Sequence, residues 1–291
     1  MLKRLFSTTL LLLSIILPMS GQTSGEVKEG EAIESKILRH KVKYTVYLPP
    51  DYPTSSRFYP VVYLLHGFTG NETDWVQYGQ IDQLADKAIR DGLIPPMIIV
   101  MPDGDSSWYI NDFNGKARYE DMLVNEFLPT IEKEYHIGRA KEFRAIAGLS
   151  MGGYGALTLA MRHPDLFASV AALSPAIISD SEMKKRLQND VWCYNTIFGP
   201  LKNDSLPEWW DHYSVLKLAT ATDKNSLTSV HWYIDCGDDD YLADGSTLLC
   251  MILRERKIAH EYRVRNGAHT WEYWCEGIIP ALQFIGKNFT R

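Results

Sequence analysis

A single serine is surrounded by glycines in the segment IAGLSMGGYG, which runs from Ile146 to Gly155. The segment follows an apolar run and precedes a stretch of helical character, so the chain must turn sharply at Ser150. Gly148 and Gly152 flank the serine at the two positions where a side chain would collide with such a turn. This G-x-S-x-G pattern, placed between strand and helix, favours a nucleophilic serine over an ordinary glycine-rich turn.

A serine hydroxyl needs a base before it can act as a nucleophile. Among the eight histidines, only His269 follows the last expected strand, in the loop NGAHTW. In a sheet that carries a serine on such a turn, the base comes from a loop in this position. We therefore predict that His269 is the base, and the alternative is a loop histidine that caps the final helix. Activity should fall in acid, because a protonated imidazole cannot accept a proton.

Three carboxylates, Asp238, Asp239 and Asp240, follow the expected strand that ends at Cys236. One of them should hold the imidazole in the correct tautomer. We favour Asp240, because Gly237 starts the turn and the third acid is best placed to swing back. Spacing alone does not settle the choice among the three. The alternative for Asp238 and Asp239 is a solvated acidic turn, and a metal site is a further option. A metal site is disfavoured, because no second cluster of ligands is evident.

Two backbone N–H groups should stabilise the negative oxygen that forms when the serine attacks a carbonyl. One is the N–H of Met151, directly after the serine. The other should come from the loop HGFTG after an early buried strand, and we predict the N–H of Phe68. His66 in the same loop is interpreted as a structural residue that orients the loop.

The rest of the chain alternates strands and helices. Buried strands with helices between them predict an α/β fold, with a mainly parallel central sheet and helices on both faces. The candidate residues above all follow strands, where the carboxyl ends of a parallel sheet form a site. We expect strands at 42–48, 59–65, 96–101, 143–149, 167–173, 230–236 and 261–264, and helices at 81–89, 119–135, 151–162, 246–256 and 271–288.

Residues 34–291 are expected to form one catalytic domain. Residues 175–228 interrupt the alternation of strands and helices and are rich in tryptophan, tyrosine and polar residues. We predict that they form a helical, cap-like insertion. Residues 22–33 are polar and are expected to form a flexible lead-in.

Residues 1–21 have the three-part layout of a signal peptide: Lys3 and Arg4, then an apolar run, then small residues. The run is short for a membrane anchor, although an uncleaved anchor is the alternative. Cleavage near Gly21 would make the mature protein secreted or periplasmic. No later segment is long and apolar enough to span a bilayer.

The full chain has a formal net charge of −6. Loss of the two cationic residues of the leader makes this charge more negative, so a nucleic-acid partner is disfavoured. Four cysteines in 291 residues do not make a disulfide framework, and their spacing matches no zinc pattern. The serine chemistry requires no metal and no cofactor.

The segments YLLHGFTGNETDW, GLSMGGYGAL, DCGDDDYL and GAHTWEYW resemble the esterase D-like family of α/β-hydrolases. This family includes feruloyl and acetyl xylan esterases, tributyrin esterases, S-formylglutathione hydrolases and mycolyltransferases. The resemblance implies an α/β-hydrolase fold, aligns the family's aspartate with Asp240 and places the second oxyanion donor at Phe68. The segment SSWYINDFNGKARYED is similar to the secreted, carbohydrate-linked and tributyrin esterase branch. Export argues against S-formylglutathione hydrolysis.

The expected activity is that of a serine carboxylesterase with Ser150, Asp240 and His269 as its triad. Its partner is a small-molecule or polysaccharide-linked ester, most simply a feruloyl or acetyl ester on plant polysaccharide. Alternatives are a broad short-chain esterase, an acyltransferase to a sugar hydroxyl, and a non-catalytic binding module. Four rings could stack on a hydroxycinnamoyl group or sugar, or could simply pack at the rim: Trp108, Tyr109, Trp271 and Trp274.

Overall fold

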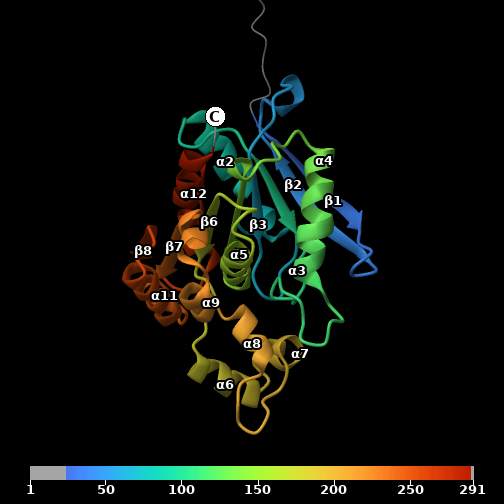
Figure 1. Cartoon of the computed structure of the whole chain (residues 1–291). Helices are drawn as coiled ribbons and strands as arrows, with labels where there is room; N and C mark the ends of the chain where they lie inside the picture. Colours follow the sequence, from blue (N-terminus) through green and yellow to red (C-terminus); the bar gives the residue numbers. More distant parts are fainter. Residues whose placement is uncertain (1–23, 290–291) are drawn as a thin grey trace, which may run out of the picture.

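The computed structural model describes residues 24–289 and contains one eight-stranded sheet in the order β1-β2-β4-β3-β5-β6-β7-β8 (Figure 1). The β1–β2 and β2–β4 pairs are antiparallel, and all other neighbouring strands are parallel. The strands are β1 (Glu26–Glu34), β2 (Lys41–Leu48), β3 (Val61–Leu65), β4 (Ile98–Pro102), β5 (Arg144–Leu149), β6 (Ser169–Leu173), β7 (His231–Gly237) and β8 (His260–Arg265). The mainly parallel sheet confirms the predicted fold class.

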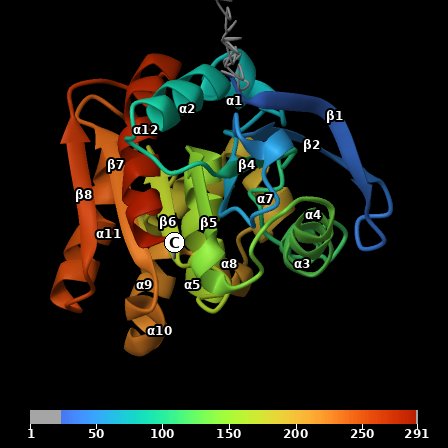
Figure 2. The same cartoon turned by 90° about the horizontal axis from the view of Figure 1, so that it is seen from above.

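Helices cover both faces of the sheet, and each face has its own hydrophobic core (Figure 2). Helices α2 and α12 pack on one face, and α3, α4, α5, α9 and α11 lie on the other. The helices are α1 (Asp74–Gln77), α2 (Ile81–Arg90), α3 (Tyr119–Met122), α4 (Leu128–Glu134), α5 (Met151–Arg162), α6 (Asp180–Gln188), α7 (Tyr194–Phe198), α8 (Glu208–Tyr213), α9 (Val215–Ala221), α10 (Lys224–Thr228), α11 (Ala243–Glu255) and α12 (Trp271–Asn288).

Strand β3 shows why the central strands have continuous apolar sequences. All five of its residues, VVYLL, are buried. Val62 and Leu64 belong to the core under α2 and α12, whereas Val61, Tyr63 and Leu65 belong to the opposite core. Because both faces are covered, an alternation of apolar and polar residues is absent from this strand.

The prediction of a flexible lead-in at 22–33 is wrong over most of its length, because β1 occupies Glu26–Glu34. This edge strand is held by its antiparallel pairing with β2, in which Glu34 lies opposite Lys41 and forms an ion pair with it at 3.4 Å. Most of its side chains are polar and at least partly exposed, so hydrophobic periodicity gave no signal for it.

The helix expected at 119–135 is not uniform. It consists of α3, a π-helical segment over Leu123–Phe127, and α4. Pro129 lies in the first turn of α4 and has no N–H to donate one turn back. The wider π-helical turn lies directly before this proline, which cannot supply the hydrogen bond that a regular α-helix would make there.

The insertion at 175–228 is helical as predicted and contains α6 to α10. Helices α6, α7 and α8 project from the end of the body in Figure 1. Helix α9 instead packs against α5 and α11, so it belongs to the helical layer beside the sheet. The proposed signal peptide, residues 1–21, lies outside the described residues. Across residues 24–289, no helix has both the length and the hydropathy to cross a membrane.

Candidate active site

Ser150 lies between the end of β5 and the start of α5 with a backbone φ of +54° and ψ of −116°, a strained conformation for a residue other than glycine. The two flanking glycines make this turn possible. A Cβ on Gly148 would lie 2.5 Å from the backbone of Gly152, and a Cβ on Gly152 would lie 2.4 Å from the carbonyl oxygen of Leu65. The turn is also fixed by the Ser150 N–H, which donates to the Leu173 carbonyl at 2.9 Å.

His269 connects the serine to an aspartate. Its Nε2 lies 2.9 Å from Ser150 Oγ, and its Nδ1 lies 2.8 Å from Asp240 Oδ2. Ser150 is 9% exposed and Asp240 is 4% exposed, so the chain of hydrogen bonds runs from a small opening at the serine to a buried carboxylate. The structure thus brings together the three residues that the sequence predicts as a triad.

The three consecutive aspartates separate in the fold. Asp240 points inward to His269, and its Oδ1 accepts a hydrogen bond from the Leu242 N–H at 2.9 Å. Asp238 accepts from the Gly267 N–H at 3.0 Å, and Asp239 is exposed. Within residues 24–289, no group of three His, Cys, Asp or Glu side chains is arranged to hold a metal ion.

Burial by itself raises the pKa of Asp240, but the hydrogen bonds from His269 and from the Leu242 N–H outweigh it. The net effect holds the pKa of this carboxyl below its ordinary value. Asp240 is therefore ionised at neutral pH and can stabilise a protonated imidazole beside it.

The loops that carry Asp240 and His269 are joined by a close backbone contact. A Cβ on Gly237 would lie 2.0 Å from the Gly267 carbonyl oxygen, so a side chain at 237 would separate the two loops. The Asp239 N–H donates to the same carbonyl at 3.0 Å. After His269, the Thr270 side chain accepts from the Tyr273 N–H and caps α12. The position of the histidine is therefore set by backbone packing on both sides.

The candidate oxyanion donors lie in the expected segments. Met151 is the first residue of α5, so its N–H has no partner within the helix. In the described part of the chain, no protein group accepts a hydrogen bond from the Phe68 N–H.

The loop of Phe68 is anchored by His66, which is buried. The Gly104 N–H donates to His66 Nε2 at 2.7 Å, so Nδ1 carries the proton and donates to the Gly67 carbonyl at 2.8 Å. His66 is thus a structural residue.

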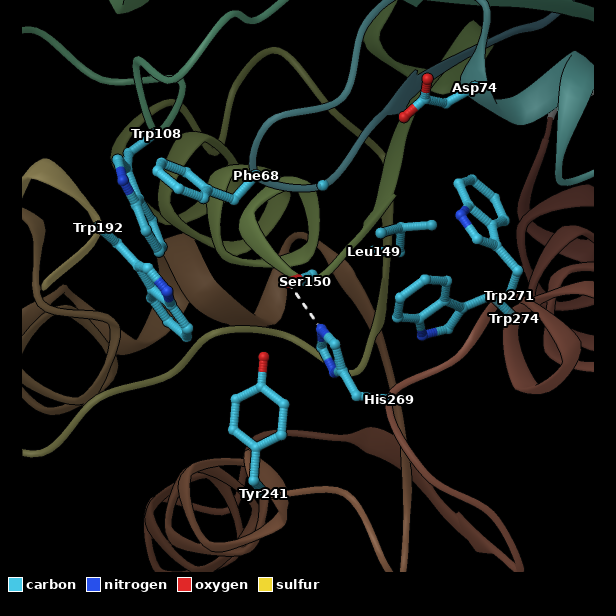
Figure 3. A pocket seen from close by; sticks show the side chains of 11 residues that line it. Phe68, Asp74, Trp108, Leu149, Ser150, Trp192, Tyr241, His269, Trp271 and Trp274 are labelled. Atoms are coloured by element: carbon cyan, nitrogen blue, oxygen red, sulfur yellow. Dashed lines mark hydrogen bonds between the residues drawn. The ribbon is translucent and has the colours of Figure 1, made fainter.

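Ser150 and His269 open into a cavity of about 270 Å³ (Figure 3). Phe68, Trp108 and Trp192 lie on one side of the serine, and Trp271 and Trp274 lie on the other. The Trp108 and Trp192 rings are stacked with their centroids 6.1 Å apart. The complete lining is Gly67, Phe68, Asp74, Trp108, Leu149, Ser150, Trp192, Tyr241, His269, Trp271 and Trp274.

Three of the four predicted substrate aromatics, Trp108, Trp271 and Trp274, line this cavity. The geometry corrects the interpretation of Tyr109. Its side chain is fully buried, its ring fills the space beside Gly104 and Gly155, and its hydroxyl donates to the His66 carbonyl at 3.1 Å. Tyr109 therefore supports the oxyanion loop from behind and does not line the cavity.

Two aromatic residues of the cavity were missed by the sequence analysis. Tyr241 directly follows Asp240, and its ring centroid lies 4.8 Å from that of His269. Its position beside the predicted acid was a usable signal. Trp192 comes from the insertion, where a turn with φ of +56° presents it to the cavity. Nothing in its local sequence separates Trp192 from the other tryptophans of that segment.

Comparison with known proteins shows the family to which this chain belongs. Residues 35–285 match the family described as "Putative esterase". The chain is 28% identical over 265 residues to an acetyl esterase of Caldicellulosiruptor saccharolyticus, covering 87% of this chain and 96% of that relative.

Solved structures of esterases have the same fold as this chain. A ferulic acid esterase superposes with a TM-score of 0.79 at 32% identity, covering 92% of this chain and 99% of that one. An S-formylglutathione hydrolase of Staphylococcus aureus, at 20% identity and a TM-score of 0.70, covers 90% of this chain and 98% of its own and shows the shared fold. The chain therefore belongs to this esterase family, and it is a carboxylic ester hydrolase with the α/β-hydrolase fold.

Proposed function

We propose that this protein is an exported serine esterase that removes feruloyl or acetyl groups from plant polysaccharide. One observation carries the proposal: His269 bridges Ser150 and Asp240 at the floor of a cavity walled by aromatic rings. This arrangement supplies a nucleophile, a base and a group that orients the base.

In the first half of the reaction, Ser150 Oγ attacks the ester carbonyl carbon and its proton passes to His269 Nε2. Asp240, ionised and hydrogen-bonded to Nδ1, stabilises the imidazolium that forms. The N–H groups of Met151 and Phe68 hold the negative carbonyl oxygen of the tetrahedral intermediate. His269 then gives the proton to the departing alcohol oxygen, and the acyl group remains on Ser150.

In the second half, water enters the space that the alcohol has left. His269 Nε2 takes a proton from this water as it attacks the acyl-serine carbonyl, and the same two N–H groups hold the oxyanion again. The proton then returns to Ser150 Oγ, and the carboxylic acid is released. The walls of the cavity take no part in these bond changes and act by holding the acyl group.

The aromatic walls and the relatives support the choice of acyl group. A solved ferulic acid esterase shares 32% of its sequence with this chain over nearly the full length of both. The pairs formed by Trp108 with Trp192 and by Trp271 with Trp274 offer flat or edge-on contacts to a planar ring. The similarity to an acetyl esterase favours a second candidate, an esterase for short acyl groups in general.

The first test compares methyl hydroxycinnamates with short-chain p-nitrophenyl esters. The wild-type protein should hydrolyse at least one set, and Ser150→Ala should lower kcat by about 10⁴-fold or more. Ser56→Ala, at an exposed serine remote from the cavity, is the matched control and should keep wild-type activity. A preference for hydroxycinnamates supports the feruloyl substrate, and a preference for acetyl or butyryl esters supports the short-chain candidate. Folded wild-type protein that hydrolyses neither set would exclude the serine-esterase mechanism.

Export is tested separately, by expressing the full chain in a bacterium and sequencing the amino terminus of the secreted or periplasmic product. A start close to residue 22 is expected from the leader pattern. Retention of residues 1–21 on a membrane-bound product would contradict export as a free protein.

A further inference from the structure

A second cavity, of about 320 Å³, adjoins the catalytic cavity, and Tyr241 lines both of them. Tyr241 is 61% exposed, although its ring lies close to those of His269 and Trp192. In Figure 3 its hydroxyl points toward Ser150 from the His269 side of the site. Tyr241 therefore stands at the boundary between the two cavities.

The two cavities differ in chemistry. Six aromatic side chains line the catalytic cavity. The second cavity is lined by serine hydroxyls and by charged side chains of α6 and α11, together with apolar side chains that include Leu242 and Leu248. Its polar residues are Ser179, Ser181, Glu182, Arg186 and Asp244. Such a surface suits a ligand with many hydroxyl groups better than an alkyl chain.

Arg186 is the most informative of these residues. Its side chain is only 13% exposed, its Nε donates to Glu182 at 3.0 Å, and its guanidinium lies 4.4 Å from the centre of the Trp192 ring. Its guanidinium also lies 6.0 Å from the centre of the Tyr194 ring. Within residues 24–289, no partner lies within hydrogen-bond distance of its two terminal amino groups. A guanidinium held this firmly, with N–H groups unused beside a cavity, is suited to bind oxygen atoms of a ligand.

The reaction itself determines which part of the substrate reaches this cavity. The alcohol oxygen must lie next to His269 Nε2 to receive the proton, while the carbonyl oxygen faces Met151 and Phe68. Two rings pack on His269, those of Tyr241 and Trp274, and of the two only Tyr241 also lines the second cavity. An alcohol group that leaves on the Tyr241 side of His269 would therefore reach the second cavity, while the acyl group lies among the tryptophans.

We propose that the second cavity binds the saccharide that carries the ester, an inference that rests on the proposed function. Arg186 and Asp244 hydrogen-bond to sugar hydroxyls, and the exposed ring of Tyr241 packs against a sugar face. The cavity thus selects esters of sugar chains over esters of simple alcohols.

The test keeps the acyl group constant and changes the alcohol. Methyl ferulate is compared with a feruloylated arabinoxylo-oligosaccharide, or methyl acetate with acetylated xylotriose if acetyl esters are preferred. Wild-type kcat/KM should be higher for the saccharide ester. Arg186→Met and Asp244→Asn should each lower the ratio of the two kcat/KM values by about tenfold, the range expected for loss of a hydrogen bond to a charged group.

Lys185→Met is the matched control, because it removes the same charge from the same helix at an exposed residue that lines neither cavity. It should leave the ratio unchanged. The unesterified oligosaccharide is also titrated into Ser150→Ala, where binding should weaken when Arg186→Met is added. An unaltered ratio in both cavity variants, with unaltered saccharide binding, would overturn the subsite. Loss of all ester turnover in wild type would instead contradict the proposed function, and the titration would still report on the cavity.

Discussion

Ser150, His269 and Asp240 come from three loops separated by up to 119 positions in the chain, yet each is held by short-range contacts. The serine is fixed by a strained turn, the histidine by the cap of α12 and the aspartate by the Leu242 N–H. These contacts set hydrogen-bond lengths of 2.9 and 2.8 Å before any substrate is bound. Such preorganisation is what an acyl-transfer site needs, because little reorganisation is left for the reaction itself.

Replacing Asp240 should show how much the reaction depends on the carboxylate that orients His269. Asp240→Asn removes the negative charge beside the imidazolium and permits the wrong tautomer of His269, so we expect kcat to fall about 10³–10⁴-fold. Steady-state kinetics on the preferred ester measures this effect. Asp239→Asn changes the adjacent, exposed acid and should retain activity close to wild type. Equal losses in the two variants would contradict the assignment of Asp240.

At the scale of elements, the close packing of the first turn of α5 against the end of β3 determines the position of the serine. The space beside Gly152 is closed by the carbonyl oxygens of Leu65 and His66, at 2.4 and 2.6 Å from an added Cβ. Gly153 is less confined, because its nearest neighbours would lie 3.0–3.1 Å away. The two adjacent glycines therefore differ in how much the surrounding backbone must move.

This difference gives a graded prediction. Gly152→Ala should displace the oxyanion loop or unfold the turn, with a loss of several kcal/mol in the free energy of unfolding and loss of activity. Gly153→Ala should cost less on both measures, because a shift of a few tenths of an ångström accommodates it. Urea denaturation and ester hydrolysis test the pair. A Gly152→Ala variant as stable and active as Gly153→Ala would show that the turn does not depend on this contact.

At the scale of the whole molecule, a buried carboxylate joins the sheet's helical layer to the insertion. Glu120 of α3 is 2% exposed and accepts hydrogen bonds from Arg162 of α5 and Tyr213 of α8, and it also pairs with His163. Burial by itself raises the pKa of Glu120, but the hydrogen bonds with His163, Arg162 and Tyr213 outweigh this effect and lower the pKa to about 2.

This lowered pKa predicts an acid sensitivity. The unfolded chain binds the proton near the ordinary pKa of 4.5, whereas the folded chain resists it down to about 2. The stabilisation is therefore complete above pH 4.5 and is lost as the pH falls toward 2, an effect of about 3 kcal/mol.

Urea denaturation at pH 7 and at pH 2–3 measures this contribution. Glu120→Gln should be less stable than wild type at pH 7 and should lose less stability on acidification. Glu255→Gln, at an exposed acid of α11, should follow the wild-type pH dependence. A Glu120→Gln variant with the full wild-type acid sensitivity would contradict the prediction.

The sequence by itself determined the parallel core strands, the turn at Ser150 and the two loops that hold Asp240 and His269. These features are local: continuous apolar runs need cover on both faces, and glycines on either side of a serine at a strand end leave room for the sharp turn. Even the choice among three aspartates followed from turn direction together with family resemblance.

Only the tertiary structure decided the remainder. Strand β1 is stabilised by backbone pairing with β2, which leaves no mark in its polar sequence. Tyr109 and its neighbour Trp108 are chemically alike in sequence, but one fills space behind the oxyanion loop and the other lines the cavity. Trp192 and Arg186 of the insertion meet Tyr241, about fifty positions further along the chain, at the boundary of the two cavities. This contact depends on how the insertion packs on the body, and local sequence does not specify that packing.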